Sequence, residues 1–390
     1  MHQTPIAEEL QQWATRAPVT QASATHAPTG TPEPAAKIPH PRPTPEPVVL
    51  ADRPDGTVIR IGDVVSKAHA PGTDPAALAA RLHVAAHPRL RGVLLPPLPV
   101  AGDGGLLGRL HDGRPASLWP MGRPVAPDDP AAAPWEEAAT LLARLHSTPP
   151  AELALPGPVP PTRGTAGPIG GPVPAIDRTA APIGGPLPPM GGPAKVARAV
   201  ARLAEAAPVS PAARDAVRRA WRGLPPWARD EAPHATDTAP RGGGTTPGAT
   251  PVGSRGLCHG DWHLGQLVRH PAPDGPWLLI DVDDLGIGDP AWDLARPAAW
   301  FAVGFLAPEV WQRFLDAYRR AGGPAVRPEG DPWPQLDVPA RALTVQTAAL
   351  ALARAAAEGR APDEDEEALV DGCVRIAELG SGDMSSCVST

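Results

Sequence analysis

The stretch LCHGDWHLGQL, residues 257–267, places two histidines, an aspartate and a glutamine together in a chain dominated by alanine, proline, glycine and arginine. Asp261 is followed five residues later by Gln266, and fifteen residues further on the apolar run WLLI ends at Asp281. The turn sequence HPAPDGP separates GQLVR from WLLIDVDD, which predicts a β-hairpin. If this hairpin folds back over the loop, the three polar side chains converge on one point.

The three side chains supply hard oxygen atoms, which suit phosphoryl transfer. One aspartate can orient and deprotonate an attacking hydroxyl, while the amide oxygen and the other aspartate hold Mg²⁺ on nucleotide phosphates. A lone aspartate in a loop is more often a turn former or a helix cap. The combined spacing therefore carries the interpretation, and no single residue does.

Length and composition limit the class of protein. A chain of 390 residues predicts two lobes or domains, although 57 prolines and 40 glycines keep much of it out of regular structure. The net charge of −7, without a basic block, argues against nucleic-acid binding. Three cysteines without metal-ligand spacing, no signal-peptide pattern and no apolar run of about 18 residues predict a cytoplasmic protein that does not enter a membrane.

The order of elements predicts an α+β fold with two lobes. Residues 1–45 read as a disordered or weakly helical Pro/Ala-rich leader, which we exclude from the fold. Residues 46–120 read as a β-rich lobe: three short antiparallel strands up to 69, a helix capped by Thr73, and two further strands within 92–100 and 113–125.

Residues 121–380 read as a larger, mostly helical lobe interrupted by the hairpin, and 381–390 as a flexible tail. Pro/Gly-rich insertions are predicted near 151–193 and 232–255. The first contains the 14-residue tandem repeat TAGPIGGPVP and TAAPIGGPLP, starting at 165 and 179, which is too short and flexible for a solenoid.

The strings HGDWHLGQ, IDVDD and GDPAWDLA resemble the signature of the aminoglycoside phosphotransferase and choline kinase family, which is related to the protein kinases. The resemblance covers roughly residues 46–380 without the insertions, and it implies a two-lobed protein-kinase-like fold. By position it implies that Asp261 is the catalytic base and that Gln266 and Asp281 are the metal ligands. Gln266 stands where the family usually has asparagine, and it offers the same carbonyl oxygen, as in the maltokinase-like form HGDxHLGQ.

The resemblance also assigns supporting and nucleotide-binding residues. Asp293 would brace the catalytic loop, and His259 would be a packed hydrogen-bonding residue. Lys67 would pair with the α- and β-phosphates of ATP, and the backbone from about Trp119 to Gly122 would bind adenine. Only three of the 35 Lys and Arg residues are lysine, which favours a role for Lys67 over an exposed strand end.

Several points stay open from the sequence. The helix after Lys67 has no glutamate, so Lys67 pairs either with Asp281 or with a partner from another element. Asp283 and Asp284 fit either a second metal or a solvated turn. His263 fits a packed loop histidine better than a metal ligand, because partner ligands are not evident.

The sequence thus predicts a kinase that uses ATP or another nucleoside triphosphate with Mg²⁺ to phosphorylate a hydroxyl of a small molecule. Its alternative is a catalytically idle, pseudokinase-like nucleotide-binding or regulatory module, which the missing glutamate and the glutamine at 266 would suit. A scaffold that uses proline-rich stretches has support from composition alone. The sequence leaves the acceptor and the oligomeric state undetermined.

Overall fold

The computed structural model describes residues 5–16, 46–53, 56–100, 105–126, 132–153, 187–231 and 255–382. Residues 1–4 and 17–45 of the expected leader lie outside the described residues. So do the tandem repeat before residue 187, the second insertion at 232–254 and the end of the tail from 383.

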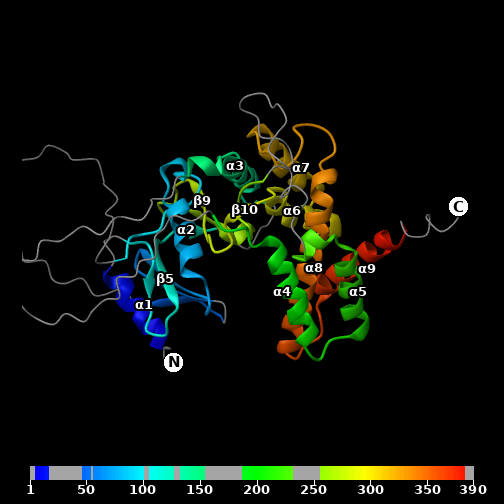
Figure 1. The fold of residues 1–390 in the computed structure, drawn as a ribbon, viewed down its shortest axis with the longest axis horizontal. Helices are drawn as coiled ribbons and strands as arrows, with labels where there is room; N and C mark the ends of the chain where they lie inside the picture. The colour runs from blue at the N-terminus through cyan, green and yellow to red at the C-terminus, as the bar shows by residue number, and fades with distance from the viewer. Residues whose placement is uncertain are drawn as a thin grey trace, which may run out of the picture.

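The N-terminal lobe is built on one antiparallel sheet with the strand order β1-β2-β3-β5-β4 (Figure 1). Buried and partly buried residues alternate along most of β2 and β3, so that one face of the sheet is buried. Lys67 lies in β3, opposite Val58 of β2 and Ser117 of β5. The strands are β1 (Val48–Arg53), β2 (Gly56–Ile61), β3 (Val64–His69), β4 (Gly108–Arg109) and β5 (Pro115–Pro120). The three strands predicted up to residue 69 are confirmed.

Two details of this lobe differ from the sequence prediction. Helix α2 (Pro75–Ala85) is capped by Asp74, whose Oδ1 accepts a hydrogen bond from the N–H of Ala76, and Thr73 instead bonds back to Ala70. The segment 92–100 forms isolated bridges, at Leu94 and Leu98, in place of a strand. Its prolines at 96, 97 and 99 lack the N–H groups that a ladder requires.

The expected leader contains a helix that belongs to the fold, which corrects the prediction for residues 5–16. Helix α1 (Pro5–Arg16) buries Ala7, Leu10 and Ala14 against β2 and β3. Ser66 of β3 donates a hydrogen bond of 3.1 Å to the carbonyl oxygen of Leu10. The apolar stripe consists mainly of alanine, so its spacing of three and four residues is weak in the sequence.

The C-terminal lobe is a group of helices interrupted by two small sheets. Helices α4 and α6 pack on α8, α5 packs on α9, and α3 packs on α7. The helices are α3 (Trp135–His146), α4 (Gly192–Glu205), α5 (Pro211–Gly223), α6 (Ala291–Val303), α7 (Pro308–Arg320), α8 (Trp333–Ala357) and α9 (Glu364–Gly382). One sheet joins β6 (Arg123–Pro124), β8 (Leu267–Arg269) and β9 (Trp277–Leu279), and the other joins β7 (Gly256–Cys258) and β10 (Gly286–Gly288).

The predicted α+β architecture with a small β-rich lobe and a larger helical lobe is confirmed. In Figure 1 the five-stranded sheet with α1 lies at one end, and α4, α5, α8 and α9 lie at the other. The hairpin of β8 and β9 and the strand β10 lie between these ends (Figure 1). None of the helices in the described ranges is long and apolar enough to cross a membrane.

Replacing Leu10 by alanine tests whether α1 is part of the folded domain. Leu10 is fully buried, so Leu10→Ala is expected to lower the free energy of unfolding by about 2–5 kcal/mol. Urea denaturation of the full chain measures this change. Gln12→Ala, at an exposed position of the same helix, is the control and should change stability by less than about 0.5 kcal/mol. Equal stability of the Leu10→Ala variant and the wild type would show that α1 does not pack on the sheet.

Candidate active site

The loop 259–266 connects β7 to β8 and lies against the loop 281–285. Gly260 has a φ of +84°, and a Cβ at this position would lie 2.2 Å from the carbonyl oxygen of Asp284. Only glycine fits both the backbone conformation and this close approach. The loop 259–266 and the loop 281–285 are therefore in direct contact.

Asp293 braces the first of these loops, as predicted. Its Oδ2 accepts from the N–H of His259 at 2.6 Å, and its Oδ1 accepts from the N–H of Gly260 at 2.8 Å. His146 of α3 lies 2.8 Å from Oδ2, and the other nitrogen of its ring lies 2.8 Å from the hydroxyl of Tyr318. Burial by itself raises the pKa of Asp293, but these bonds hold that pKa below its ordinary value. A buried carboxylate thus ties the loop to α3 and α7.

The hairpin brings Gln266 and Asp281 together. The N–H of Ile280 donates to the carbonyl oxygen of Gln266, and Leu267 pairs with Leu279 in the following rung. As a result, the Gln266 amide lies 3.4 Å from Asp281 Oδ2. His259 is fully buried and donates from Nε2 to the carbonyl oxygen of Ile280 at 2.7 Å, which confirms its predicted packing role.

Asp281 also joins the two lobes through Lys67. Lys67 Nζ lies 2.7 Å from Asp281 Oδ1 and 3.0 Å from Asp283 Oδ2, and the lysine side chain is 17% exposed. Burial alone lowers the pKa of Lys67, but the two carboxylates outweigh it and raise that pKa well above its ordinary value. The sequence left open whether Lys67 pairs with Asp281 or with a residue of another element. In the structure Lys67 pairs with Asp281 and also with Asp283. An exposed strand-end lysine is therefore excluded.

Asp261 lies between two cations from the helical lobe. Lys195 Nζ of α4 is 2.6 Å from Asp261 Oδ2, and Arg296 Nη2 of α6 is 3.1 Å from Oδ1. Burial raises the pKa of Asp261, but Lys195 and Arg296 outweigh it, so that the carboxyl pKa lies below its ordinary value. The carboxylate is ionised and held in one orientation.

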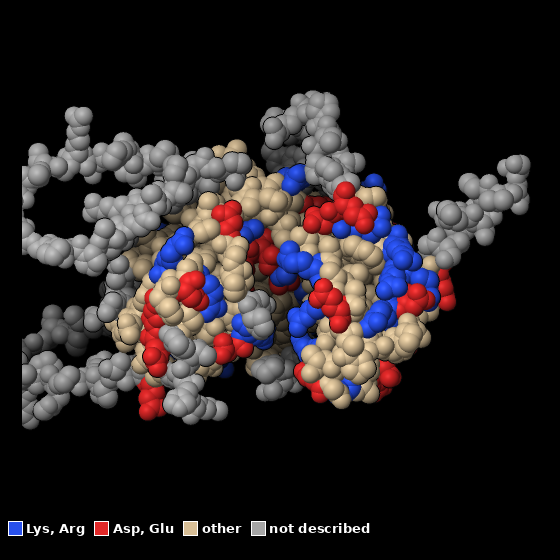
Figure 2. Space-filling view, turned by 60° about the horizontal axis from the view of Figure 1, so that its bottom comes forward, with Lys and Arg blue, Asp and Glu red and all other residues tan. Residues whose placement is uncertain are grey.

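Asp283 and Asp284 form a turn after the strand, but their side chains are only partly exposed and pair with cations. Asp283 accepts from Lys67 and lies 3.1 Å from Nδ1 of His69, which is fully buried. Asp284 Oδ2 lies 2.7 Å from Nζ of Lys195. On the face of the molecule shown in Figure 2, acidic and basic residues of the described ranges are interspersed, and no large area of these ranges carries a single sign of charge.

Helix α2 has no glutamate to pair with Lys67, but it contacts the loop 281–285 through an arginine. Arg81 donates from Nε to the carbonyl oxygen of Leu285 at 2.8 Å. Burial lowers the pKa of Arg81, which the charges of Asp284 and Asp283 partly offset. The helix is therefore attached to the loop that carries Asp281 without contacting Lys67 through a carboxylate of its own.

Two other predictions can be placed in the structure. His263 Nδ1 accepts a hydrogen bond from the N–H of Gly265 and caps the short 3₁₀ turn Leu264–Gln266. Among the described residues, no group of three or more His, Cys, Asp or Glu side chains is arranged to hold a metal ion. Trp119 is the last residue but one of β5. Gly122 follows the end of this strand and packs on Val268. Between them, Met121 donates its N–H to the carbonyl oxygen of Asp63.

The sequence did not identify Lys195, Arg296 and His69 as members of this cluster. The rarity of lysine was the one available signal for Lys195, because arginine supplies nearly all other positive charges. Arg296 and His69 carried no local pattern that separates them from ordinary helix and strand residues.

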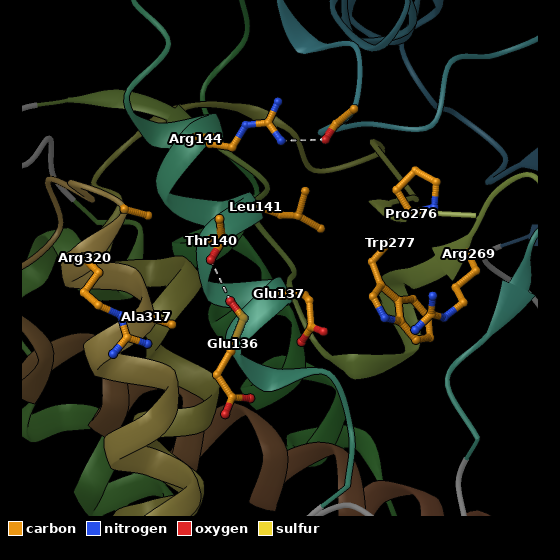
Figure 3. Close-up of a pocket in the computed structure, with 12 residues that line it drawn as sticks. Glu136, Glu137, Thr140, Leu141, Arg144, Arg269, Pro276, Trp277, Ala317 and Arg320 are labelled. Carbon is orange, nitrogen blue, oxygen red and sulfur yellow. Dashed lines mark hydrogen bonds between the residues drawn. The ribbon is translucent and has the colours of Figure 1, made fainter. Parts of the chain in front are cut away.

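A pocket of about 660 Å³ lies on another part of the lobe and contains none of these residues. It is lined by side chains of α3, α7 and the β8–β9 hairpin, and Figure 3 shows Arg269 lying over the ring of Trp277 at its edge. Glu136 and Glu137 come from the first turn of α3 (Figure 3). The site built from Asp261, Gln266 and Asp281 is therefore distinct from this pocket.

Comparison with known proteins gives one match in sequence. Residues 55–333 match the phosphotransferase enzyme family, and no curated protein matches the chain. Among solved structures, a choline/ethanolamine kinase family protein from Mesorhizobium loti is 15% identical, with 86% of this chain and 87% of that chain covered and a TM-score of 0.43. A spectinomycin phosphotransferase in complex with ADP and spectinomycin is 12% identical, with 86% and 93% covered and a TM-score of 0.46. An aminoglycoside 2′-phosphotransferase in a GDP complex is 15% identical, with 88% and 94% covered and a TM-score of 0.41.

Substitution of the bracing carboxylate tests its role in the fold. In Asp293→Asn the amide group must face two backbone N–H donors, so the free energy of unfolding is expected to fall by about 2–4 kcal/mol. Urea denaturation checks this value. Asp274→Asn, in the exposed hairpin turn, serves as the matched control and should be neutral. A neutral Asp293→Asn variant would contradict the bracing role.

His263 predicts a pH dependence of stability. Burial and the nearby Arg296 lower its pKa from 6.5 to about 4. The unfolded chain therefore binds a proton at this histidine between pH 6.5 and 4 while the folded chain does not, so stability falls as the pH falls through that window. The wild type should lose more stability over this range than His263→Gln. An imidazole titration by NMR with a midpoint near 6.5 for His263 would contradict the assignment.

Proposed function

The chain belongs to the phosphotransferase enzyme family, and on that premise we propose that it transfers the γ-phosphoryl group of ATP, or of another nucleoside triphosphate, to a hydroxyl of a small molecule with the help of Mg²⁺. The observation that carries the proposal is the convergence of Gln266, Lys67 and Asp281 beside the loop of Asp261. These side chains come from both lobes. They supply oxygen ligands for a metal ion and an ammonium group for phosphates, and phosphoryl transfer requires both.

The side chains fit a magnesium ion. Gln266 Nε2 lies 3.4 Å from Asp281 Oδ2, and turning the amide group over would direct its oxygen to the same place, beside the carboxylate oxygens of Asp281. Two protein ligands suffice, since Mg²⁺ usually keeps waters and is completed by substrate phosphates. When bound, the ion would neutralise charge on the phosphates. The φ of +63° at Asp281 is uncommon for a residue other than glycine, and such strain is often found at functional sites.

Lys67, Trp119 and Gly122 are proposed to bind the nucleotide. The ammonium group of Lys67 is already charged and lies next to Asp281, so it can reach phosphates held at the same point. The backbone of Trp119 and Gly122 is proposed to contact the base.

Asp261 is proposed to act on the acceptor. Its carboxylate orients the hydroxyl and takes up its proton while the acceptor oxygen forms a bond to the γ-phosphorus. The bond from that phosphorus to the β,γ-bridging oxygen breaks, and its electron pair leaves on the nucleoside diphosphate. In the nucleotide-free protein Lys195 and Arg296 keep this carboxylate ionised, so its orientation contributes more than its basic strength.

The idle nucleotide-binding module is not supported. Its main argument was a lysine without an anchoring glutamate, but the carboxylates of Asp281 and Asp283 anchor Lys67 instead. The cytoplasmic location, the absence of nucleic-acid partners, and the likeness of the loop to maltokinases stay predictions from the sequence. The lobe boundary near residue 120 is likewise proposed.

Replacement of the base gives the direct test of the proposal. Asp261→Asn keeps the shape of the side chain but removes proton uptake, so the rate should fall by about 10²–10⁴-fold. The measurement is ATP consumption, with mass-spectrometric detection of phosphorylated product, against a panel of sugars, amino alcohols and aminoglycosides. Asp371→Asn, exposed on α9, is the control and should retain full activity. An Asp261→Asn variant as active as the wild type would exclude the proposed role.

A further inference from the structure

Lys195 reaches the site from an element that lies outside both of its loops. It occupies the first turn of α4, and its Nζ lies 2.6 Å from Asp261 Oδ2 and 2.7 Å from Asp284 Oδ2. Its side chain is 23% exposed, so the ammonium group is shielded without being sealed from solvent. It is the closer of the two cations that flank Asp261, since Arg296 lies at 3.1 Å.

The backbone before Lys195 is fitted onto the loop that carries Asp281. Met190 donates its N–H to the carbonyl oxygen of Ile287, and Gly191 donates its N–H to that of Asp284. A Cβ at residue 191 would lie 2.0 Å from Asp284 Oδ1, so any larger residue there would displace the Asp284 side chain. The start of α4 is therefore held in a fixed position relative to the loop by contacts that do not involve the lysine side chain.

The choice of lysine is informative in this chain. Only three of its 35 Lys and Arg residues are lysine, and both lysines within the described ranges, Lys67 and Lys195, contact this carboxylate cluster. If the residue only bridged two carboxylates, the guanidinium group of an arginine would suit that role at least as well as an ammonium group. An ammonium group is instead a compact point charge that can move between oxygen atoms over a short distance.

Lys195 lies between the loop proposed to bind the acceptor and the loop proposed to bind the metal and the nucleotide. Asp261, on one side, faces the acceptor hydroxyl in the proposed function, and Asp284, on the other side, belongs to the loop of the proposed metal ligand Asp281. A phosphoryl group that passes from the nucleotide to the acceptor must cross between these loops. Fixed cations that meet such a group stabilise the charge on its oxygen atoms.

We propose that Lys195 is a further catalytic residue, which binds a non-bridging oxygen of the γ-phosphoryl group during its transfer. This inference rests on the proposed function. Lys195 keeps its proton throughout: the acceptor proton goes to Asp261, the acceptor oxygen bonds to phosphorus, and the diphosphate leaves with the electron pair. In the absence of nucleotide the same ammonium group is held by Asp261 and Asp284.

The test compares two nucleotides that differ in the γ-phosphoryl group. Calorimetry on the full chain measures the Kd of Mg-ADP and of the non-hydrolysable analogue Mg-AMP-PNP for the wild type and Lys195→Met. Loss of the γ-phosphoryl contact should weaken Mg-AMP-PNP about tenfold, or about 1.4 kcal/mol, and leave Mg-ADP within about twofold. Arg198→Met, one turn further along α4 and exposed, is the matched control and should change neither Kd.

Turnover gives a second readout with water as the acceptor. Intrinsic ATP hydrolysis by Lys195→Met should fall by about 10²-fold or more, while Arg198→Met keeps the wild-type rate. If Lys195→Met weakens both nucleotides equally, or neither, Lys195 is only a structural clamp and the inference fails while the proposed function stands. If the wild type binds neither nucleotide, both fail. Circular dichroism and thermal unfolding confirm that each variant is folded.

Discussion

The repulsion between neighbouring carboxylates is the constraint on which this structure depends. Asp261, Asp281, Asp283 and Asp284 lie on two loops in direct contact, and partly buried carboxylates at such short range are stable only when cations lie between them. Lys67 comes from the sheet, Lys195 from α4 and Arg296 from α6. Because each cation comes from a different part of the fold, neutralising the cluster also joins the lobes.

The site combines fixed and exchangeable interactions. Asp293 is fully enclosed by His146 and two backbone N–H groups, and nothing in the proposed reaction displaces these bonds. The lysine pairs differ because ammonium groups can exchange a carboxylate for a phosphate oxygen at little cost in charge. The chain therefore holds the backbone of the loop of Asp261 in place, and it leaves the lysine side chains that are proposed to bind the nucleotide free to change partners.

The sequence predicted the local parts of this arrangement and missed those that depend on long-range packing. The convergence of Gln266 and Asp281 was predicted because a hairpin with a readable turn joins them, and the contact of Asp293 with the loop was predicted from the motif around it. Lys195 could not be placed, since α4 lies far along the chain from both loops and is set by contacts at Gly191. Helix α1 was missed because alanine forms most of its buried stripe, and the strand expected at 92–100 failed because its prolines cannot pair.

The central claim is that this carboxylate and lysine cluster is the site of a magnesium-bound nucleotide. A crystal structure of the full chain with Mg²⁺ and AMP-PNP tests it most directly. The account predicts a metal bound by Gln266 Oε1 and Asp281, with the ammonium groups of Lys67 and Lys195 moved onto phosphate oxygens. Nucleotide bound elsewhere, with the Lys67–Asp281 and Lys195–Asp261 pairs intact and no metal beside Gln266, would contradict it.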